Sequence, residues 1–345
     1  MQLSSPQGPA EPAERTADVQ TDSQTSSRRV CVIANPGSGR RDPSLFQQIE
    51  DTLCGDASST GLPSCEVRAV EKGMALDKLA RQAVDDGFDV VAAAGGDGTI
   101  GAVASAIFDA RKGAKPLPHL GIIPLGTFNY VARSLNIPLD DPAAAARVLL
   151  TSPPRAFSIG EVNGRVFLNN ASLGAYPAIL DQREGIYKRW GRSRMAAYWS
   201  VIRALSTLGT PLSMGIEVDG SRIRKTSSLA FVAKSAYQID EFDLPGADEV
   251  RKDQFALFVA PDAGRFGLIL RAIRLAGRTA RLGRDMEMIY GRDVTITTRQ
   301  KHRLMARDGE KETMTSPFRF RLHPDVLQVV APPASDPQPA PEGSA

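Results

Sequence analysis

The sequence has few of the residues on which disulfide-rich and zinc-dependent proteins rely. It holds three cysteines, Cys31, Cys54 and Cys65, without CxxC spacing, so neither a disulfide framework nor a zinc site is predicted. Its three histidines are scattered and no HExxH motif occurs, which argues against a histidine-centred mechanism. The cysteine usage suits a reducing compartment, and we expect the protein in the cytoplasm.

Long hydrophobic runs are also missing. No stretch reaches the roughly 18 consecutive apolar residues that cross a bilayer. The first 27 residues contain four acids and no apolar segment of the kind found in a signal peptide. What remains is typical of a folded globular chain, with 42% hydrophobic and 23% charged residues. A length of 345 residues exceeds what one core usually organises, so we expect two domains.

Positive charge is concentrated in two segments. Residues 183–205 hold six basic residues and one acid, and residues 263–284 hold six arginines and no acid. Aromatic or aliphatic residues alternate with these charges, a composition that suits an anionic membrane surface. We expect reversible, peripheral membrane binding, and the alternative is a pair of solvated helices whose apolar stripes pack on the protein. No nucleic-acid-binding signature accompanies the charges, so nucleic acid is not an expected partner.

Strand-like and helix-like segments alternate in the first half of the chain. Residues 1–27 and 332–345 are predicted to be disordered, because they offer almost nothing to bury. Between residues 28 and 153, the pattern predicts strands at 29–34, 65–70, 89–94 and 120–124, with helices at 45–53, 76–86 and 100–111. This alternation predicts an α/β domain with a mostly parallel sheet.

The second half, residues 154–331, has a different character. Short strand-like runs separated by turn signals such as Asn163-Gly164 and Asp219-Gly220 predict a domain of antiparallel sheet. The strands are expected at residues 157–162, 165–171, 214–218, 227–233, 255–260, 293–298 and 318–322. Two basic helices, at residues 184–208 and 266–282, interrupt them.

Glycine-rich turns follow three of the predicted parallel strands. They read NPGSG at residues 35–39, GGDGT at 95–99 and LGT at 125–127. Carboxyl ends of parallel strands lie at one edge of a sheet, and glycine turns and helix N-termini there bind phosphate groups. The sequence has no P-loop motif, and the GxGxxG at 96–101 is not on the first strand, so a dinucleotide-dependent hydride transfer is not favoured.

Asp97 is unusual within an anion-binding turn. Its carboxylate would repel phosphate unless a divalent cation or an acceptor hydroxyl lay between them, which favours Mg²⁺-dependent phosphoryl transfer. The alternative is an ordinary strand-to-helix turn with Asp97 near the N-cap.

Five motifs occur in an order that resembles the diacylglycerol kinase catalytic-domain family, which includes bacterial lipid kinases and is related to sphingosine kinases. They are NPGSG (35–39), GGDGT (95–99), IPLGTFNYVARSL (123–135), FLNNASLGAYP (167–177) and RDGE (307–310). The resemblance implies a phosphofructokinase-like parallel-sheet nucleotide domain, an antiparallel β-sandwich domain for the lipid, and transfer of the ATP γ-phosphate to a lipid hydroxyl. A homodimer is left open.

The resemblance also assigns roles to residues. Asp308 and Glu310 match the catalytic acid pair, with one of them as the base and the other, with Asp97, orienting metal or substrate; which acid does which stays open. Taken alone, Asp308-Gly309 is also a standard hairpin turn. The expected nucleotide contacts are Asn35, Pro36, Gly37, Ser38, Gly39, Gly95, Gly96, Asp97, Gly98, Thr99, Ile100, Gly101 and Thr127.

A structural Mg²⁺ site is implied by a second match. Val250, Asp253 and Phe255 correspond to its ligands, although Gln254 replaces the usual glycine. Tyr130, Gly101 and Ala69 also depart from common family residues. These departures keep two alternatives open, an NAD kinase-like enzyme, whose family shares GGDGT, and a lipid-binding protein that has lost catalysis.

Overall fold

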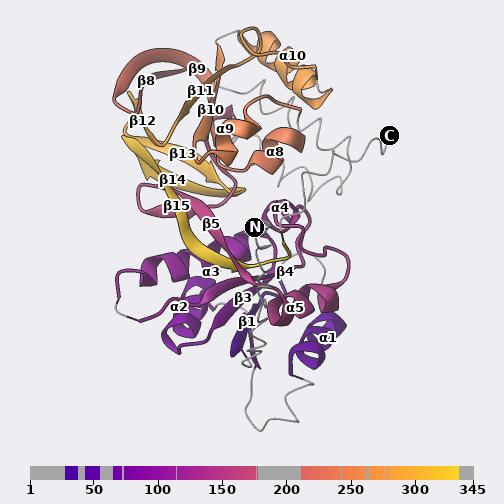
Figure 1. The fold of residues 1–345 in the computed structure, drawn as a ribbon. Helices are drawn as coiled ribbons and strands as arrows, with labels where there is room; N and C mark the ends of the chain where they lie inside the picture. Colours follow the sequence, from indigo (N-terminus) through magenta and orange to yellow (C-terminus); the bar gives the residue numbers. More distant parts are fainter. Residues whose placement is uncertain are drawn as a thin grey trace, which may run out of the picture.

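The computed structural model describes residues 28–37, 43–54, 65–71, 74–113, 115–175, 177, 211–241, 243–261, 264–277 and 279–333. The predicted arm at 1–27, most of the tail at 332–345 and the basic segment at 184–208 lie outside these ranges. The described chain folds into an α/β part and an antiparallel part, stacked in Figure 1 with the α/β part below.

The α/β part has the alternating elements that the sequence predicted. Its strands β2-β1-β3-β4 pair in parallel in that order. The strands are β1 (Val30–Ala34), β2 (Cys65–Ala69), β3 (Val90–Gly95) and β4 (His119–Pro124), and the helices are α1 (Pro43–Cys54), α2 (Leu76–Asp85), α3 (Asp97–Ala110), α4 (Tyr130–Ser134) and α5 (Pro142–Thr151). The predicted α/β fold class is confirmed, while α4 and α5 were not anticipated.

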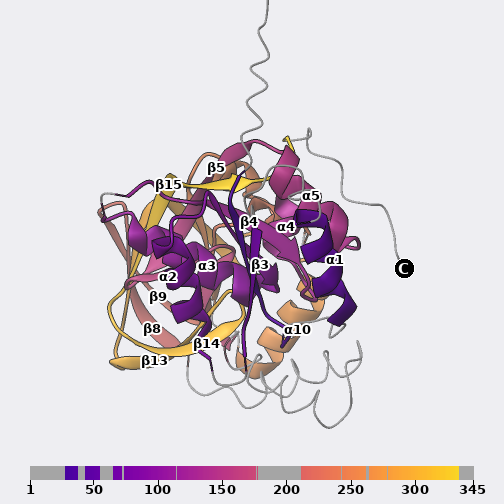
Figure 2. The same ribbon diagram turned by 90° about the horizontal axis from the view of Figure 1, so that it is seen from below.

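Burial explains why this sheet forms. Every residue of β1 and β3 is buried, as expected for parallel strands covered on both faces. Helices α2 and α3 lie on one side of the sheet and α1 and α5 on the other (Figure 2). The helices cover both faces of the sheet. The edge available to a ligand is therefore at the carboxyl ends of the strands, where the glycine turns begin.

The remaining chain forms the predicted antiparallel sheet. Hydrogen-bonded neighbours follow the order β14-β13-β7-β9-β8-β12-β15, with β10, β11, β5 and β6 attached at the sides. The elements are β5 (Pro154–Val162), β6 (Arg165–Phe167), β7 (Asn170–Gly174), β8 (Leu212–Val218), β9 (Ser221–Ala233), α8 (Ala236–Glu241), α9 (Ala247–Arg251), β10 (Phe255–Pro261), α10 (Gly264–Ala276), β11 (Glu287–Gly291), β12 (Asp293–Thr298), β13 (His302–Arg307), β14 (Glu310–Thr315) and β15 (Phe318–Val330).

These strands enclose one apolar core. Its largest members, Phe167, Phe255, Phe318 and Phe320, are almost completely buried and come from three distant segments of the chain. The strand predicted at 165–171 is interrupted at residues 168–169, between β6 and β7. The interruption has a physical cause described below, because the backbone N–H groups at this corner bind a carboxylate instead of a neighbouring strand.

Two long strands join the two parts. β5 and β15 pair along most of their length, and the register shifts between His323 and Leu327. Beyond that shift, Val329 pairs in parallel with Leu120 of β4 and is buried in the core of the α/β part. The end of the folded chain therefore returns to the first sheet. The predicted domain boundary between residues 153 and 154 stays a prediction.

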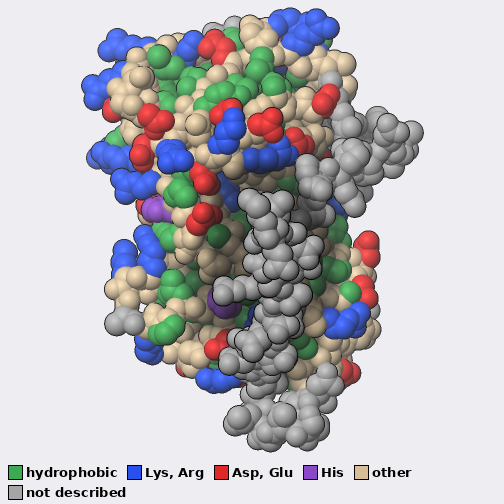
Figure 3. All heavy atoms as spheres, in the orientation of Figure 1, with side chains coloured by type: hydrophobic (Ala, Val, Ile, Leu, Met, Phe, Trp, Pro, Cys, Tyr) green, Lys and Arg blue, Asp and Glu red, His purple; other side chains and the backbone are tan. Residues whose placement is uncertain are grey.

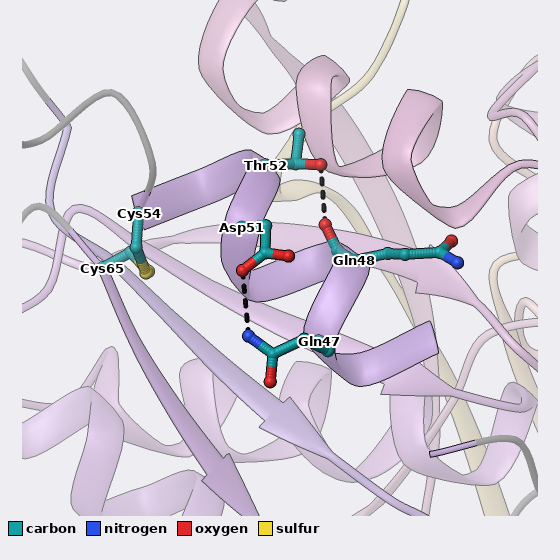
Figure 4. Close-up of a disulfide and its surroundings, with 6 residues drawn as sticks. All are labelled: Gln47, Gln48, Asp51, Thr52, Cys54 and Cys65. Carbon is teal, nitrogen blue, oxygen red and sulfur yellow. Dashed lines mark hydrogen bonds between the residues drawn. A yellow bond between two sulfur atoms is a disulfide. The ribbon is translucent and has the colours of Figure 1, made fainter. Parts of the chain in front are cut away.

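The expectation that the cysteines would be unpaired is wrong for two of them. Cys54, at the end of α1, is bonded to Cys65, at the start of β2, with their Cα atoms 5.5 Å apart (Figure 4). Cys31 is free and buried. Spacing alone missed this pair, because the bridge depends on where the end of α1 lies relative to the start of β2.

None of the helices within the described ranges combines the length and the apolar character that crossing a bilayer requires.

Candidate active site

The three glycine turns meet at the carboxyl edge of the parallel sheet. The Asn35 side chain donates from Nδ2 to the Thr99 hydroxyl at 3.1 Å, which ties the first turn to the second. The backbone N–H of Leu125 donates to the Gly95 carbonyl at 2.8 Å, which ties the second to the third. Motifs separated by up to 90 residues in the chain thus form one surface.

Gly126 shows how closely the second and third turns pack. A β-carbon added at this position would lie 2.5 Å from the Gly96 Cα and 2.7 Å from the Asn129 Oδ1. Since real β-carbons do not approach backbone atoms so closely, only glycine fits here. The glycine of the LGT turn therefore serves packing between the turns.

Asp97 is the first residue of α3 and faces the next helix. Its Oδ1 accepts the backbone N–H of Val131 at 3.3 Å. Burial raises the pKa of this carboxyl, while backbone N–H groups of Val131, Tyr130 and Asn129 oppose the rise. The carboxylate thus lies at the N-terminus of α4, where the positive helix end favours a negative group, and it connects GGDGT to the third turn.

Asn129 holds the third turn in shape. It adopts a left-handed backbone with φ of 53°, is 5% exposed, and donates from Nδ2 to the Gly126 carbonyl at 3.0 Å. Sequence reasoning did not propose Asn129 as a site residue, although asparagine is among the residues that tolerate this conformation. Tyr130 follows it, and its ring stacks on Phe128 with 5.7 Å between centroids.

Asp308 lies in the turn between β13 and β14, so the hairpin reading of Asp308-Gly309 is confirmed. Its carboxylate accepts three backbone N–H groups of the interrupted corner: Leu168 at 2.6 Å, Asn169 at 2.8 Å and Asn170 at 3.1 Å. Burial raises the pKa of Asp308, and the three N–H groups oppose the rise. The carboxylate therefore fixes the corner between β6 and β7.

Glu310 occupies a different environment. It is the first residue of β14 and is exposed, and its side chain forms no hydrogen bond with the described residues. Its Oε1 lies 3.2 Å from the place that a β-carbon on Gly98 would occupy. An acid from the antiparallel part therefore lies beside the GGDGT turn of the α/β part, at the positive end of α3.

The other predicted contact residues have different surroundings. Asn35 and Gly37 lie together, since the Gly37 N–H donates to the Asn35 Oδ1 at 3.1 Å. Ile100 is completely buried, so its side chain does not face a ligand, whereas Gly101 has open space beside it. Pro36 and Thr127 are exposed, and Ser38 and Gly39 lie outside the described residues.

The predicted structural metal site has a different arrangement around Asp253. The Ser158 hydroxyl donates to the Asp253 Oδ1 at 2.8 Å, and the Asp253 N–H donates to the Val250 carbonyl at 3.2 Å. No cluster of three or more His, Cys, Asp or Glu side chains able to hold a metal occurs among the described residues. Phe255 is completely buried at the start of β10. The Asp253 carboxylate is thus engaged by protein groups.

Lys234 is a charged residue that sequence reasoning missed. It follows β9, its backbone N–H donates to the Asn169 carbonyl at 2.8 Å, and its ammonium lies 3.9 Å from the centroid of the Phe157 ring. Burial lowers the pKa of Lys234 to about 8, against the opposing effect of Asp308, Asp253 and Asp325. A positive charge near Asp253 opposes the binding of a divalent cation there, and the structural Mg²⁺ at Val250, Asp253 and Phe255 stays a prediction.

Comparisons with known proteins agree with this architecture. The sequence model of the family described as the diacylglycerol kinase catalytic domain matches residues 29–162. Over these residues the chain is similar to that family, and the resemblance found in the motifs is confirmed.

Relatives extend the match beyond this domain. A diacylglycerol kinase of Bacillus subtilis is 29% identical over 294 residues, which is 82% of this chain and 90% of the relative. A Pseudomonas aeruginosa protein named as a probable lipid kinase, YegS-like, is 42% identical over 97 residues, 28% of this chain and 30% of the relative. The crystal structure of a diacylglycerol kinase from Bacillus anthracis superposes with a TM-score of 0.65 at 19% identity, covering 89% of this chain and 98% of that one. The fold is therefore shared along nearly the whole length.

Proposed function

We propose that this protein is a lipid kinase that transfers the γ-phosphate of ATP to the hydroxyl of a lipid. The observation that carries the proposal is the position of Glu310 beside the GGDGT turn at Gly98. Among the described residues this carboxylate has no hydrogen-bond partner, and it comes from the antiparallel part to glycines suited to phosphate, which is where a proton acceptor and a phosphoryl donor must meet. The names of the relatives support the same reaction class.

The glycine turns would hold the triphosphate. The first turn of α3 begins at Asp97 without a side-chain cap, so its N-terminal N–H groups and the helix dipole are directed toward an anion. Asn35 and Thr99 hold the neighbouring turn in place through their hydrogen bond. Mg²⁺ usually binds through one or two carboxylates together with substrate phosphates, and Asp97 is the acid that would orient it at this edge. When bound, Mg²⁺ would neutralise charge on the transferred phosphoryl group.

Glu310 is proposed as the general base and Asp308 as a positioning residue. The lipid oxygen attacks the γ-phosphorus, the bond to the β,γ-bridging oxygen breaks, ADP leaves, and the hydroxyl proton passes to Glu310. Asp308 is poorly suited to accept that proton, because both of its oxygens already accept backbone N–H groups. Its role would be to hold the turn that presents Glu310.

The acceptor is proposed to be diacylglycerol or a sphingoid-like lipid. The relatives that match most of the chain are named diacylglycerol kinases, so diacylglycerol is the first acceptor to test. No feature of the described residues favours NAD as acceptor or a loss of catalysis, and both alternatives are resolved by the same assay.

The test is a transfer assay on the full chain with labelled ATP, Mg²⁺ and mixed micelles of diacylglycerol or sphingosine, with NAD as a third acceptor. We expect a phosphorylated lipid, identified by mass spectrometry. Replacing the base removes a contribution of about 100- to 10,000-fold, so Glu310→Gln should lower kcat by that order. Glu217→Gln, which removes an exposed acid paired with Arg222, is the matched control and should leave kcat unchanged.

The two acids are expected to contribute differently to the free energy of unfolding. Asp308→Asn leaves an amide facing backbone donors and should lower the free energy of unfolding by about 2 to 3 kcal/mol, whereas Glu310→Gln should leave it nearly unchanged. Urea unfolding of both variants measures this difference. Phosphorylation of NAD alone, absence of any product, or full activity of Glu310→Gln would each refute the proposal.

A further inference from the structure

Helix α10 exposes an apolar stripe. Phe266 is 90% exposed, Leu270 47% and Ile273 59%. Their spacing of four and three residues places the three side chains on one face of the helix. Among the described residues no other large hydrophobic side chain is as exposed, and Leu282, just beyond α10, is 40% exposed.

The stripe is separate from the face by which α10 packs on the protein. Leu268 is 8% exposed, and together with Ile269 and Ala272 it packs against Ala175 and Leu229. A core-facing helix normally needs only one such apolar face. The second apolar face of α10 therefore has no packing role within the described structure.

The arginines of α10 fix the helix in place. The Arg271 guanidinium donates to the carbonyls of Pro261 and Arg284, and Arg274 pairs with Asp285 at 2.8 Å. Asp285 is buried, and Arg284 also binds it. Hydrogen bonds from Arg284, with further ones from Arg274 and the Arg281 backbone, hold the pKa of Asp285 well below its usual range. These contacts hold α10 at a fixed orientation on the antiparallel part.

The segment that carries the stripe is rich in positive charge. The sequence from Gly264 to Asp285 contains several arginines and a single acid, Asp285, and Arg281 and Arg284 are exposed. Hydrophobic and basic side chains both reach the surface at the end of the molecule that carries α10 (Figure 3). An apolar stripe in an arginine-rich segment is complementary to the headgroup region of an anionic bilayer, where apolar and basic side chains both contribute.

We propose that α10 is a membrane-docking helix, which inserts Phe266, Leu270 and Ile273 into the headgroup boundary of an anionic lipid bilayer. The inference deepens the proposed function, since a lipid acceptor remains in the membrane and the enzyme has to reach it there. It rests on the proposed function for the reason to dock, while the docking surface itself is argued from α10. Docking is led by the apolar stripe, because Arg271 and Arg274 are already engaged by the protein.

Vesicle co-sedimentation tests the proposal. The full chain is mixed with vesicles of phosphatidylcholine, with or without phosphatidylglycerol. We expect binding to the anionic vesicles, and a loss of about tenfold or more in the combined variant Phe266→Ser, Leu270→Ser and Ile273→Ser. The control variant, Met74→Ser with Leu304→Ser, removes two similarly exposed hydrophobic residues elsewhere and should bind like the wild type.

Three outcomes would overturn the proposal. The first two are equal vesicle binding by the wild type and by the combined Phe266, Leu270 and Ile273 variant (the stripe variant), and no vesicle binding by the wild type. The third is a wild-type dimer that the stripe variant converts to a monomer in sedimentation without lipid, because the stripe would then be a self-association surface.

A short-chain diacylglycerol in solution separates docking from catalysis. The stripe variant should phosphorylate it like the wild type while failing to bind vesicles. If neither protein phosphorylates any lipid but binding still depends on the stripe, the proposed function fails and the docking surface stands.

Discussion

Asp308 and Glu310 are two residues apart in the chain, yet their carboxylates have different surroundings. A turn with left-handed backbone at Asp308 and Gly309 directs the first acid toward the corner at residues 168–170 and leaves the second beside Gly98. The pairing of the acids was predictable from the RDGE motif. Their different environments were not, because Asp308 contacts residues about 140 positions earlier in the chain and Glu310 lies beside a residue about 210 positions earlier.

Lys234 provides a residue-scale prediction about pH. Its pKa is lowered by burial from the usual 10.5 to about 8, so between these values the unfolded chain holds a proton that the folded protein has released. The contribution of this group to stability is therefore smallest below pH 8 and rises between about pH 8 and 10.5. Urea unfolding across this range should show the rise in the wild type.

The variant Lys234→Met should remove that rise. Lys78→Met, at an exposed position of α2, is the control and should retain it. If wild type and Lys234→Met show the same slope of unfolding free energy against pH, the lysine is not buried in the way described.

At the scale of elements, the turns after the strands were readable from the sequence and their mutual contacts were not. Glycine after an apolar run marks a strand-to-helix turn by local chemistry alone. The need for glycine at residue 126 arises from Gly96, 30 positions away. The strand predicted at 165–171 likewise had a suitable composition, and only the Asp308 carboxylate explains its interruption.

The bond between Cys54 and Cys65 gives a prediction at the same scale. It closes a short loop between α1 and β2, with a sequence separation of 11 residues. Restricting a loop of this size in the unfolded chain stabilises a protein by about 3 kcal/mol in the chain-entropy treatment. Addition of a reductant should therefore lower the wild-type free energy of unfolding by that order.

A double variant provides the control for this measurement. Cys54→Ser with Cys65→Ser should unfold at the same denaturant concentration with and without reductant, whereas free Cys31 remains in both proteins. A wild type that is insensitive to reductant would show that the bond contributes nothing to stability.

At the scale of the whole molecule, β5 and β15 connect the parallel sheet of the α/β part to the antiparallel part. The register shift in β15 lies near Asp325, whose N–H donates to Ser158, and Ser158 in turn binds Asp253. The residues matched to a structural metal therefore lie where the two parts join. Lys234 supplies positive charge there, which is the physical basis for expecting a junction that needs no metal.

Metal removal tests this expectation on the whole protein. Without nucleotide, EDTA should leave the thermal midpoint unchanged, because no described carboxylate at the junction depends on a cation. Mg²⁺ with ATP at about 100 times Kd should stabilise the protein by about 2.7 kcal/mol. A fall in the midpoint with EDTA alone, restored by Mg²⁺, would mean that Asp253 does bind a metal.

The sequence by itself determined the alternation of strands and helices and the glycine turns, since both follow from local composition and periodicity. Its resemblance to a known family singled out the two late acids. The tertiary structure decided that Glu310 reaches Gly98, that Asp308 holds a backbone corner, that Lys234 lies among three acids and that α10 has a second apolar face. These features depend on which distant segments become neighbours, and that is set by strand pairing and packing between residues that local patterns treat as unrelated.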